Sequence, residues 1–153
     1  MAGDYRVRQA ESADVARVAP LFDGYRQFYG QPSEPRTAEA FLTERVTNGQ
    51  SIVFLAEEEN GAVLGFAQLY PGFSSVRAEP TFVLNDLFVE EQARGRGVAR
   101  QLVEAVEDHA RSCGVSNLSL STARDNHPAQ QLYRNIGWQQ DSRFLTFTRS
   151  LEV

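Results

Sequence analysis

The chain has 153 residues and a mass of 17.1 kDa, enough for one compact domain with a sizeable core and too few for two ordinary ones. Its 15 Lys and Arg residues against 20 Asp and Glu residues give a formal charge of −5, which excludes the basic bias that nonspecific nucleic-acid binding needs. We therefore predict a single domain over residues 1–153 and no nucleic-acid partner.

The first elements alternate between strand and helix patterns. Residues 4–10 read as a strand, and Ser12 is a plausible N-cap for a helix whose apolar face continues past Pro20. A proline inside a helix kinks or divides it, so we expect a bent first helical region. Residues 37–46 predict a second, shorter helix that begins at a capping threonine.

The middle of the chain predicts strands. Two β-rich runs within residues 51–70 are joined by Asn60-Gly61, which accept the positive φ angles of a tight hairpin turn. A turn-like stretch follows at 71–80, and residues 81–89 are rich in β-branched and aromatic side chains, typical of another strand.

Beyond Gly97 the apolar residues recur every fourth position, which predicts a helix of about four turns that ends at Gly114. Residues 117–122 read as a further strand. Asn126 is expected to cap a last helix, which stops at Gly137. The segments "WQQ" and "RFLTFTRS" then predict a closing hairpin, so the order is β-α-α-β-β-β-α-β-α-β-β, a mixed α/β domain.

The junction "ARGRGVAR", residues 93–100, predicts an anion site. A strand that ends near Val89 and a helix that starts near Gly97 leave unpaired N–H groups at the positive end of a helix dipole. Gly95 and Gly97 allow the backbone to approach an anion closely, and three side chains can add charge-assisted hydrogen bonds: Arg94, Arg96 and Arg100. The lysine and Ser/Thr of a P-loop are absent, as is the third glycine of a dinucleotide fingerprint. A solvated arginine-rich helix start is the alternative interpretation.

Two motifs resemble the GNAT acetyltransferase superfamily. "LFVEEQARGRGVARQL" is similar to its motif A, whose Arg/Gln-x-x-Gly-x-Gly/Ala pattern falls on Arg94, Gly97 and Ala99. "NHPAQQLYRNIGW" is similar to its motif B, on Asn126, Ala129, Leu132, Tyr133, Gly137 and Trp138. The two stand in the family's order and spacing, and the resemblance covers nearly the whole chain.

This resemblance implies an acyl-coenzyme A fold: a mixed, splayed central sheet of about seven strands flanked by four helices. It also implies acetyl-coenzyme A as cosubstrate, with its pyrophosphate on the backbone around residues 94–99 and its pantetheine along a bulged strand. The implied coenzyme-binding residues are Leu87, Phe88, Val89, Arg94, Gly95, Arg96, Gly97, Val98, Ala99, Arg100, Asn126 and Tyr133.

Acetyl transfer to an amine needs a proton acceptor, because an alkylamine with a pKa of about 10.4 is mostly protonated at pH 7, and it needs a proton for the departing thiolate. The resemblance places Tyr133 near the coenzyme sulfur, as general acid. Polyamine-type relatives carry Glu-Asp where this chain has Asn85-Asp86, so a direct carboxylate base at position 85 is absent. We expect Asn85 to orient a water and Asp86 to supply negative charge; a structural Asp86 is the alternative.

For the acceptor, "FDGYRQFYG" supplies Asp23, Tyr25, Phe28 and Tyr29 near the end of the first helix, where this superfamily often builds its acceptor pocket. Aromatic and acidic side chains suit a cationic amine, although each of these residues could equally be a packing residue. We expect no metal, because the two histidines and the single cysteine, Cys113, lack ligand spacing.

The sequence thus predicts an N-acetyltransferase that transfers acetyl from acetyl-coenzyme A to a small primary amine, such as a polyamine or amino acid, directly in a ternary complex. A protein lysine or N-terminus as acceptor, or a noncatalytic acetyl-coenzyme A sensor, are the alternatives. No stretch reaches the roughly 20 apolar residues of a membrane span, and the presence of a single cysteine fits a cytoplasmic setting. Family habit and the apolar closing hairpin predict a homodimer.

Overall fold

The computed structural model describes residues 4–153, which form two compact units, up to Ser121 and from Thr122 onward. The first unit contains β1 (Tyr5–Gln9), the 3-10 turn η1 (Ser12–Asp14), α1 (Val15–Phe28), α2 (Pro35–Thr47), β2 (Ile52–Glu58), β3 (Val63–Ser74), β4 (Glu79–Val89), the 3-10 turn η2 (Glu91–Ala93), α3 (Val98–Ser112) and β5 (Leu118–Ser119). The second unit contains α4 (His127–Asn135).

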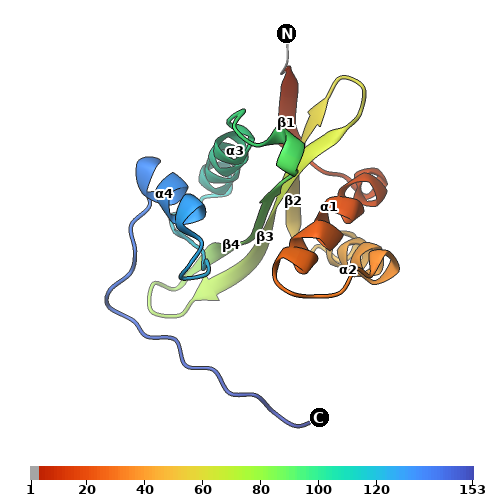
Figure 1. Ribbon diagram of the computed structural model, residues 1–153. Helices are drawn as coiled ribbons and strands as arrows, with labels where there is room; N and C mark the ends of the chain where they lie inside the picture. Colours follow the sequence, from red (N-terminus) through yellow and green to blue (C-terminus); the bar gives the residue numbers. More distant parts are fainter. Residues whose placement is uncertain (1–3) are drawn as a thin grey trace. The chain divides into compact units, whose positions relative to one another are not determined.

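The sheet of the first unit has the order β1-β2-β3-β4-β5. Its first three pairings are antiparallel and the β4–β5 pairing is parallel. Figure 1 shows α1 and α2 on one side of this sheet and α3 on the other. The GNAT-type α/β arrangement with four helices is confirmed, but the sheet has five strands and the expected number of about seven is wrong.

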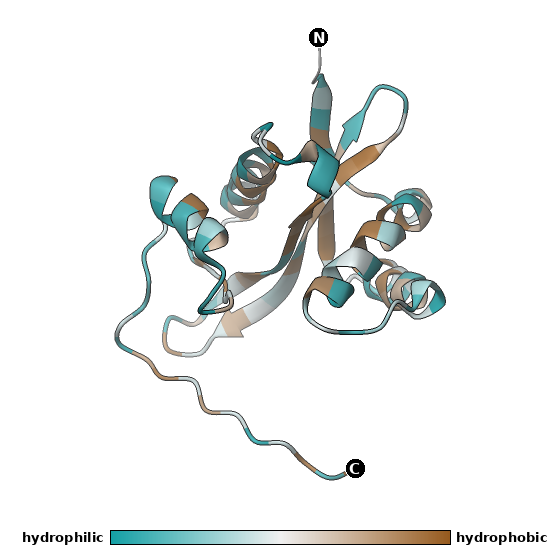
Figure 2. Cartoon of the chain, in the orientation of Figure 1, coloured by the Kyte–Doolittle hydropathy of each residue, from teal (hydrophilic) through white to brown (hydrophobic). Residues whose placement is uncertain are grey.

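Successive side chains of a strand point to opposite faces of the sheet, and both faces of this sheet carry buried side chains. The α1 and α2 side is packed around Val18, Phe22, Leu42, Leu55 and Phe66. On the α3 side, the four-residue repeat buries Leu102, Val106 and Ala110 almost completely. Figure 2 accordingly shows β2, which lies between β1 and β3, coloured as hydrophobic.

Both N-terminal helices differ in detail from the sequence-based expectation. Pro20 does not divide α1, which continues to Phe28. The residues on either side of it, Ala19 and Leu21, are both buried in the core. The second helix begins at Pro35 instead of Thr37, with proline at its first position. A proline is favoured there, because the first N–H of a helix has no intrahelical acceptor.

The hairpins follow their turn chemistry, and one is longer than expected. The Asn60-Gly61 turn joins β2 to β3, with Gly61 at a φ of 86°, so this prediction is confirmed. The stretch 71–80 is not a turn: β3 and β4 remain paired out to Ser74 and Glu79. Only residues 75–78 form the connection, with Ala78 at a φ of 56°.

Helix α3 spans 15 residues and ends at Ser112; Cys113 is its C-cap, and Gly114 follows at a φ of 73°, as its sequence pattern predicts. The strand expected at 117–122 is reduced to Leu118 and Ser119. No helix within residues 4–153 is long and apolar enough to cross a membrane.

In the second unit, the side chain of Asn126 accepts a hydrogen bond from the Ala129 N–H at 3.3 Å and caps α4. Gly137 follows the helix at a φ of 102°. The closing hairpin is absent, since residues 138–153 contain no strand. Phe144 and Phe147 are 74% and 88% exposed, so this segment has strand-favouring residues but no partner strand within the described chain.

Candidate active site

A bulge interrupts the pairing of β3 with β4. Gln68 lies opposite Asp86 and Leu69 lies opposite Leu84, so Asn85 is one extra residue on β4. Asn85 is exposed, whereas Asp86, next to it, is only 2% exposed. The bulged strand implied by the family resemblance is therefore present at Asn85.

Beyond this bulge, β4 and β5 separate. They pair only through Phe82 with Leu118 and Val83 with Ser119. From Leu84 to Val89, β4 has no strand partner on its β5 side within the described residues. Because backbone polar groups of a strand point alternately to its two neighbours, this open edge presents donors and acceptors to an extended ligand.

The open edge leads into the glycine-rich turn. Gly95 and Gly97 have φ values of 82° and 77°, in the left-handed region where L side chains are strained. The first backbone bond of α3 runs from Gln101 N to Gly97 O, at 3.0 Å. The N–H groups that precede Gln101 at the helix start are thus available to an anion at the positive end of α3.

The three arginines of the turn have different surroundings. The Nε of Arg94 donates to the carbonyl of Val89 at 3.2 Å, and Arg100 is paired with Glu104 at 3.1 Å on the exposed helix face. Arg96 lies over the ring of Tyr5, whose hydroxyl donates to the Arg96 carbonyl at 3.2 Å. Tyr5 thereby attaches the turn to β1. Val98 is buried, so only its backbone can meet a ligand.

Asp86 is the buried acid of the site. Its Oδ1 accepts from the Asn85 amide at 2.7 Å, and its Oδ2 accepts from the Gln68 amide. Burial raises the pKa of Asp86 above its usual range, while hydrogen bonds from the Asn85 and Gln68 amides oppose that shift. A raised pKa brings a carboxyl closer to the range in which it can accept a proton near neutral pH.

The predicted acceptor-binding aromatics form one group that reaches the bulge. The rings of Tyr25 and Tyr29 are 5.1 Å apart, and those of Phe28 and Tyr29 are 5.2 Å apart. The Tyr25 hydroxyl donates to the carbonyl of Asn85 at 3.0 Å. Phe28 and Tyr29 are 59% and 48% exposed, so an aromatic surface extends from solvent to the bulged strand.

Asp23, the fourth predicted acceptor residue, has a structural position. It is buried and accepts from the Ser33 hydroxyl at 2.7 Å, the Glu34 N–H at 2.8 Å and the Gln27 amide at 3.1 Å. These hydrogen bonds hold its pKa below the usual range, the Ser33 contact being the largest contribution. Asp23 therefore fixes the connection between α1 and α2, and a substrate contact at this residue stays a prediction.

Tyr133 and Asn126 belong to the second unit. Tyr133 is half-buried on α4, with its ring 5.8 Å from that of Trp138. The Oδ1 of Asn126 is used as the helix cap, which leaves its amide N–H groups for a ligand. Their roles beside the thioester stay predictions.

Sequence reasoning missed Gln68 and Tyr70 of β3. Gln68 is completely buried against Asp86, and burial near Asp86 raises the pKa of Tyr70 to about 12. A lone glutamine between apolar residues in "GFAQLY" is the only local signal, and its partner lies 18 positions away. No cluster of three or more potential metal ligands occurs within residues 4–153.

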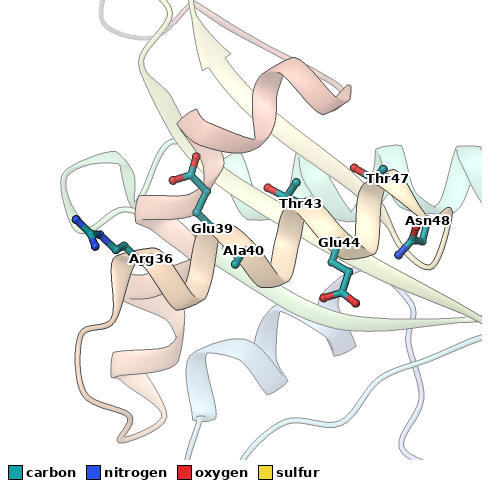
Figure 3. Close-up of a pocket in the computed structure, with 7 residues that line it drawn as sticks. All are labelled: Arg36, Glu39, Ala40, Thr43, Glu44, Thr47 and Asn48. Atoms are coloured by element: carbon teal, nitrogen blue, oxygen red, sulfur yellow. The ribbon is translucent and has the colours of Figure 1, made fainter.

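A separate open hollow of about 600 Å³ lies along α2 (Figure 3). All of its lining residues belong to this helix and its end: Arg36, Glu39, Ala40, Thr43, Glu44, Thr47 and Asn48. None is on β4 or the glycine-rich turn. Figure 3 shows Glu39, Thr43 and Thr47 along one edge of the helix and Glu44 on the opposite edge. This hollow therefore shares no lining residue with the bulged strand or the glycine-rich turn.

Comparisons with known proteins agree with this geometry. The model of the acetyltransferase (GNAT) family matches residues 18–138. An uncharacterized N-acetyltransferase, YhfO of Bacillus subtilis, is 44% identical over 92% of this chain and 94% of its own length. The D-amino-acid N-acetyltransferase of Saccharomyces cerevisiae is 31% identical over 88% of this chain and 85% of its own length. The crystal structure of a probable acetyltransferase has a TM-score of 0.90 and 36% identity, and the match covers 97% of this chain and 99% of that one.

Proposed function

Because this chain belongs to the acetyltransferase (GNAT) family, whose enzymes use acetyl-coenzyme A, we propose that it acetylates a primary amine of a small molecule in a ternary complex. The observation that carries the proposal is the open β4 edge, which joins the bulge at Asn85 to the glycine-rich start of α3. A pantetheine chain fits such an edge as a strand would. A pyrophosphate fits the free N–H groups of the turn.

The chemistry requires a neutral amine, a stabilised oxyanion and a protonated leaving thiol. In our proposal, Asn85 orients a water that removes the amine proton, and the Asp86 carboxylate beside it stabilises the resulting positive charge. A backbone N–H of residues 87–89 stabilises the thioester oxygen as it becomes negative. The amine nitrogen bonds to the thioester carbon and the C–S bond breaks, while the Tyr133 hydroxyl gives its proton to the sulfur. The proton taken from the amine returns to the Tyr133 oxygen through water.

The acceptor assignment rests on the aromatic surface of α1. The exposed rings of Phe28 and Tyr29 continue through Tyr25 to the bulge, where Asp86 supplies the negative charge. Rings and a carboxylate attract an ammonium group. The similarity to a D-amino-acid N-acetyltransferase supports a small acceptor, while a protein lysine or N-terminus is the second candidate.

Replacing Tyr29 by alanine tests this assignment. We expect the KM for a small amine to rise roughly tenfold, which corresponds to the loss of about 1.4 kcal/mol of binding, while the KM for acetyl-coenzyme A stays unchanged. Phe73→Ala is the matched control, because Phe73 is an 87% exposed aromatic on the far part of the β3–β4 hairpin. An unaltered amine KM in Tyr29→Ala, or a lysine peptide as the better acceptor, would contradict the proposal.

A homodimer and a cytoplasmic setting remain part of the proposal. The exposed apolar side chains after α4 support the dimer, among them Phe144 and Phe147. Removal of such large apolar surface from water favours association. Sedimentation at micromolar protein concentration measures the oligomeric state directly, and a monomer would refute the homodimer.

A further inference from the structure

Gln68 occupies the centre of the sheet, where an amide is unusual. It is 0% exposed and lies opposite Asp86 at the position where the β3–β4 register shifts. Its neighbours on β3, Ala67 and Leu69, are also 0% exposed. Its Nε2 donates to Oδ2 of Asp86, and Oδ1 of the same carboxyl accepts from Asn85. One buried carboxyl is therefore held between two amide donors.

Stability alone does not account for this glutamine. Its Oε1 is buried with no hydrogen-bond partner within the described residues. A buried acceptor without a partner is unfavourable for folding, and an apolar side chain of similar volume avoids that cost. The amide is explained by what its N–H holds, which is the carboxyl of Asp86.

We propose that Gln68 is a positioning residue for acetyl transfer, which holds the carboxyl of Asp86 so that Oδ1 remains the acceptor for the Asn85 amide. With the N–H side of that amide attached to Asp86, Oδ1 of Asn85 is the atom left to accept from water or an amine. The inference rests on the proposed function, in which Asn85 and Asp86 serve proton removal. Gln68 acts through them and does not touch substrate.

The electrostatic consequence has a definite sign. Burial raises the pKa of Asp86, and the Gln68 hydrogen bond opposes this by stabilising the carboxylate. The titratable groups that face Asp86 are Tyr25 of α1 and Tyr70 of β3, and both have phenol pKa values raised by burial. Neither phenol titrates near neutral pH. Loss of the Gln68 donor should therefore raise the pKa of Asp86 further.

The test uses Gln68→Leu and, as a second apolar variant, Gln68→Met. The pKa of Asp86 is measured in the free protein by carbon NMR of labelled aspartate, assigned with Asp86→Asn. We expect it to rise by about one to two pH units, the size of one lost hydrogen bond to a buried carboxylate. Leu69→Val is the control, since it changes a buried neighbour that does not contact the carboxyl.

Kinetics give the second readout. The ratio of variant to parent kcat/KM, with the same amine, cancels the titration of the amine itself. As the pH is lowered, this ratio should stay constant above both Asp86 pKa values, fall about tenfold per pH unit between them and become constant again below both. The melting temperature at neutral pH should fall, because Oδ2 of Asp86 loses its donor and a buried carboxylate with a higher pKa stabilises the fold less.

The outcomes separate this inference from the proposed function. A shifted Asp86 titration with a matching kinetic ratio supports both. If the Asp86 pKa is unshifted in both Gln68→Leu and Gln68→Met, the inference is overturned. The proposed function still stands in that case if the kcat/KM of the parent protein follows the titration of Asp86. A shifted titration with a pH-independent ratio refutes the catalytic part of Asp86, and with it any role of Gln68 in the reaction.

Discussion

Replacement of Gly97 by glutamate should weaken acetyl-coenzyme A binding through charge, and Gly97→Gln separates that effect from strain. Gly97 has a φ of 77°, and a Cβ there would meet only the Tyr5 hydroxyl, at 3.9 Å. Both variants therefore carry the same strain, about 1–2 kcal/mol for an L residue in the left-handed region, and a similar side-chain volume. Only glutamate adds a negative charge at the start of α3.

The charge effect follows from Coulomb's law. At roughly 5 Å from one phosphate charge, with an effective dielectric constant of about 40 for an exposed turn, the repulsion is about 1.7 kcal/mol. The Kd of Gly97→Glu should exceed that of Gly97→Gln by about 15-fold, and the difference should shrink in high salt. Isothermal calorimetry on variants that retain the parent circular dichroism spectrum measures both. Equal affinities for acetyl-coenzyme A would refute a pyrophosphate site at this turn.

Three further changes test the sheet, the charge network and the general acid. Gly65→Ala should lower the free energy of unfolding, measured in urea, by about 1–3 kcal/mol and should weaken coenzyme binding, because the new Cβ would lie 2.8 Å from the carbonyl oxygen of Phe88. A free energy of unfolding equal to that of the parent would contradict this close approach. Asp14 and Glu57 have pKa values lowered to about 2, chiefly by hydrogen bonds from arginine. The stability that these carboxylates contribute is fully present above their unfolded-state pKa values and should be lost as the pH falls from about 5 to 2, by roughly 2 kcal/mol each. Urea midpoints that do not change over this pH range would contradict this prediction. Tyr133→Phe should lower kcat by about 10²-fold with little change in coenzyme affinity, whereas activity within about twofold of the parent would remove the general-acid assignment.

Local patterns predict the helices and the first hairpin because their causes are local. The four-residue repeat of α3, the Asn126 cap of α4 and the Asn60-Gly61 turn each depend on residues close in sequence. The glycine-rich turn before α3 belongs to the same class, since Gly95 and Gly97 adopt the left-handed conformations that glycine favours. Such features are predictable before any tertiary contact is known.

The features that sequence reasoning missed depend on pairing between distant segments. Residues 71–80 have a turn-like composition, yet their partner strand keeps them extended. Residues 143–150 have strand-forming side chains, but a strand also needs a neighbour, and no pairing forms there. The contact of Gln68 with Asp86 follows from the register of β3 on β4, including the bulge at Asn85. The pattern of residues within one segment does not predict that register.

Release of free thiol from acetyl-coenzyme A, measured across a panel of acceptors, is the most direct test of the central claim. The panel contains polyamines, amino acids and other small primary amines, with a lysine peptide and a peptide with a free N-terminus for comparison. We predict saturable thiol release with at least one small amine, a higher kcat/KM for it than for either peptide, and loss of about 10²-fold or more in Asp86→Asn. Tight binding of acetyl-coenzyme A without turnover on any member of the panel would contradict the proposed reaction, and turnover confined to the peptides would contradict the proposed acceptor.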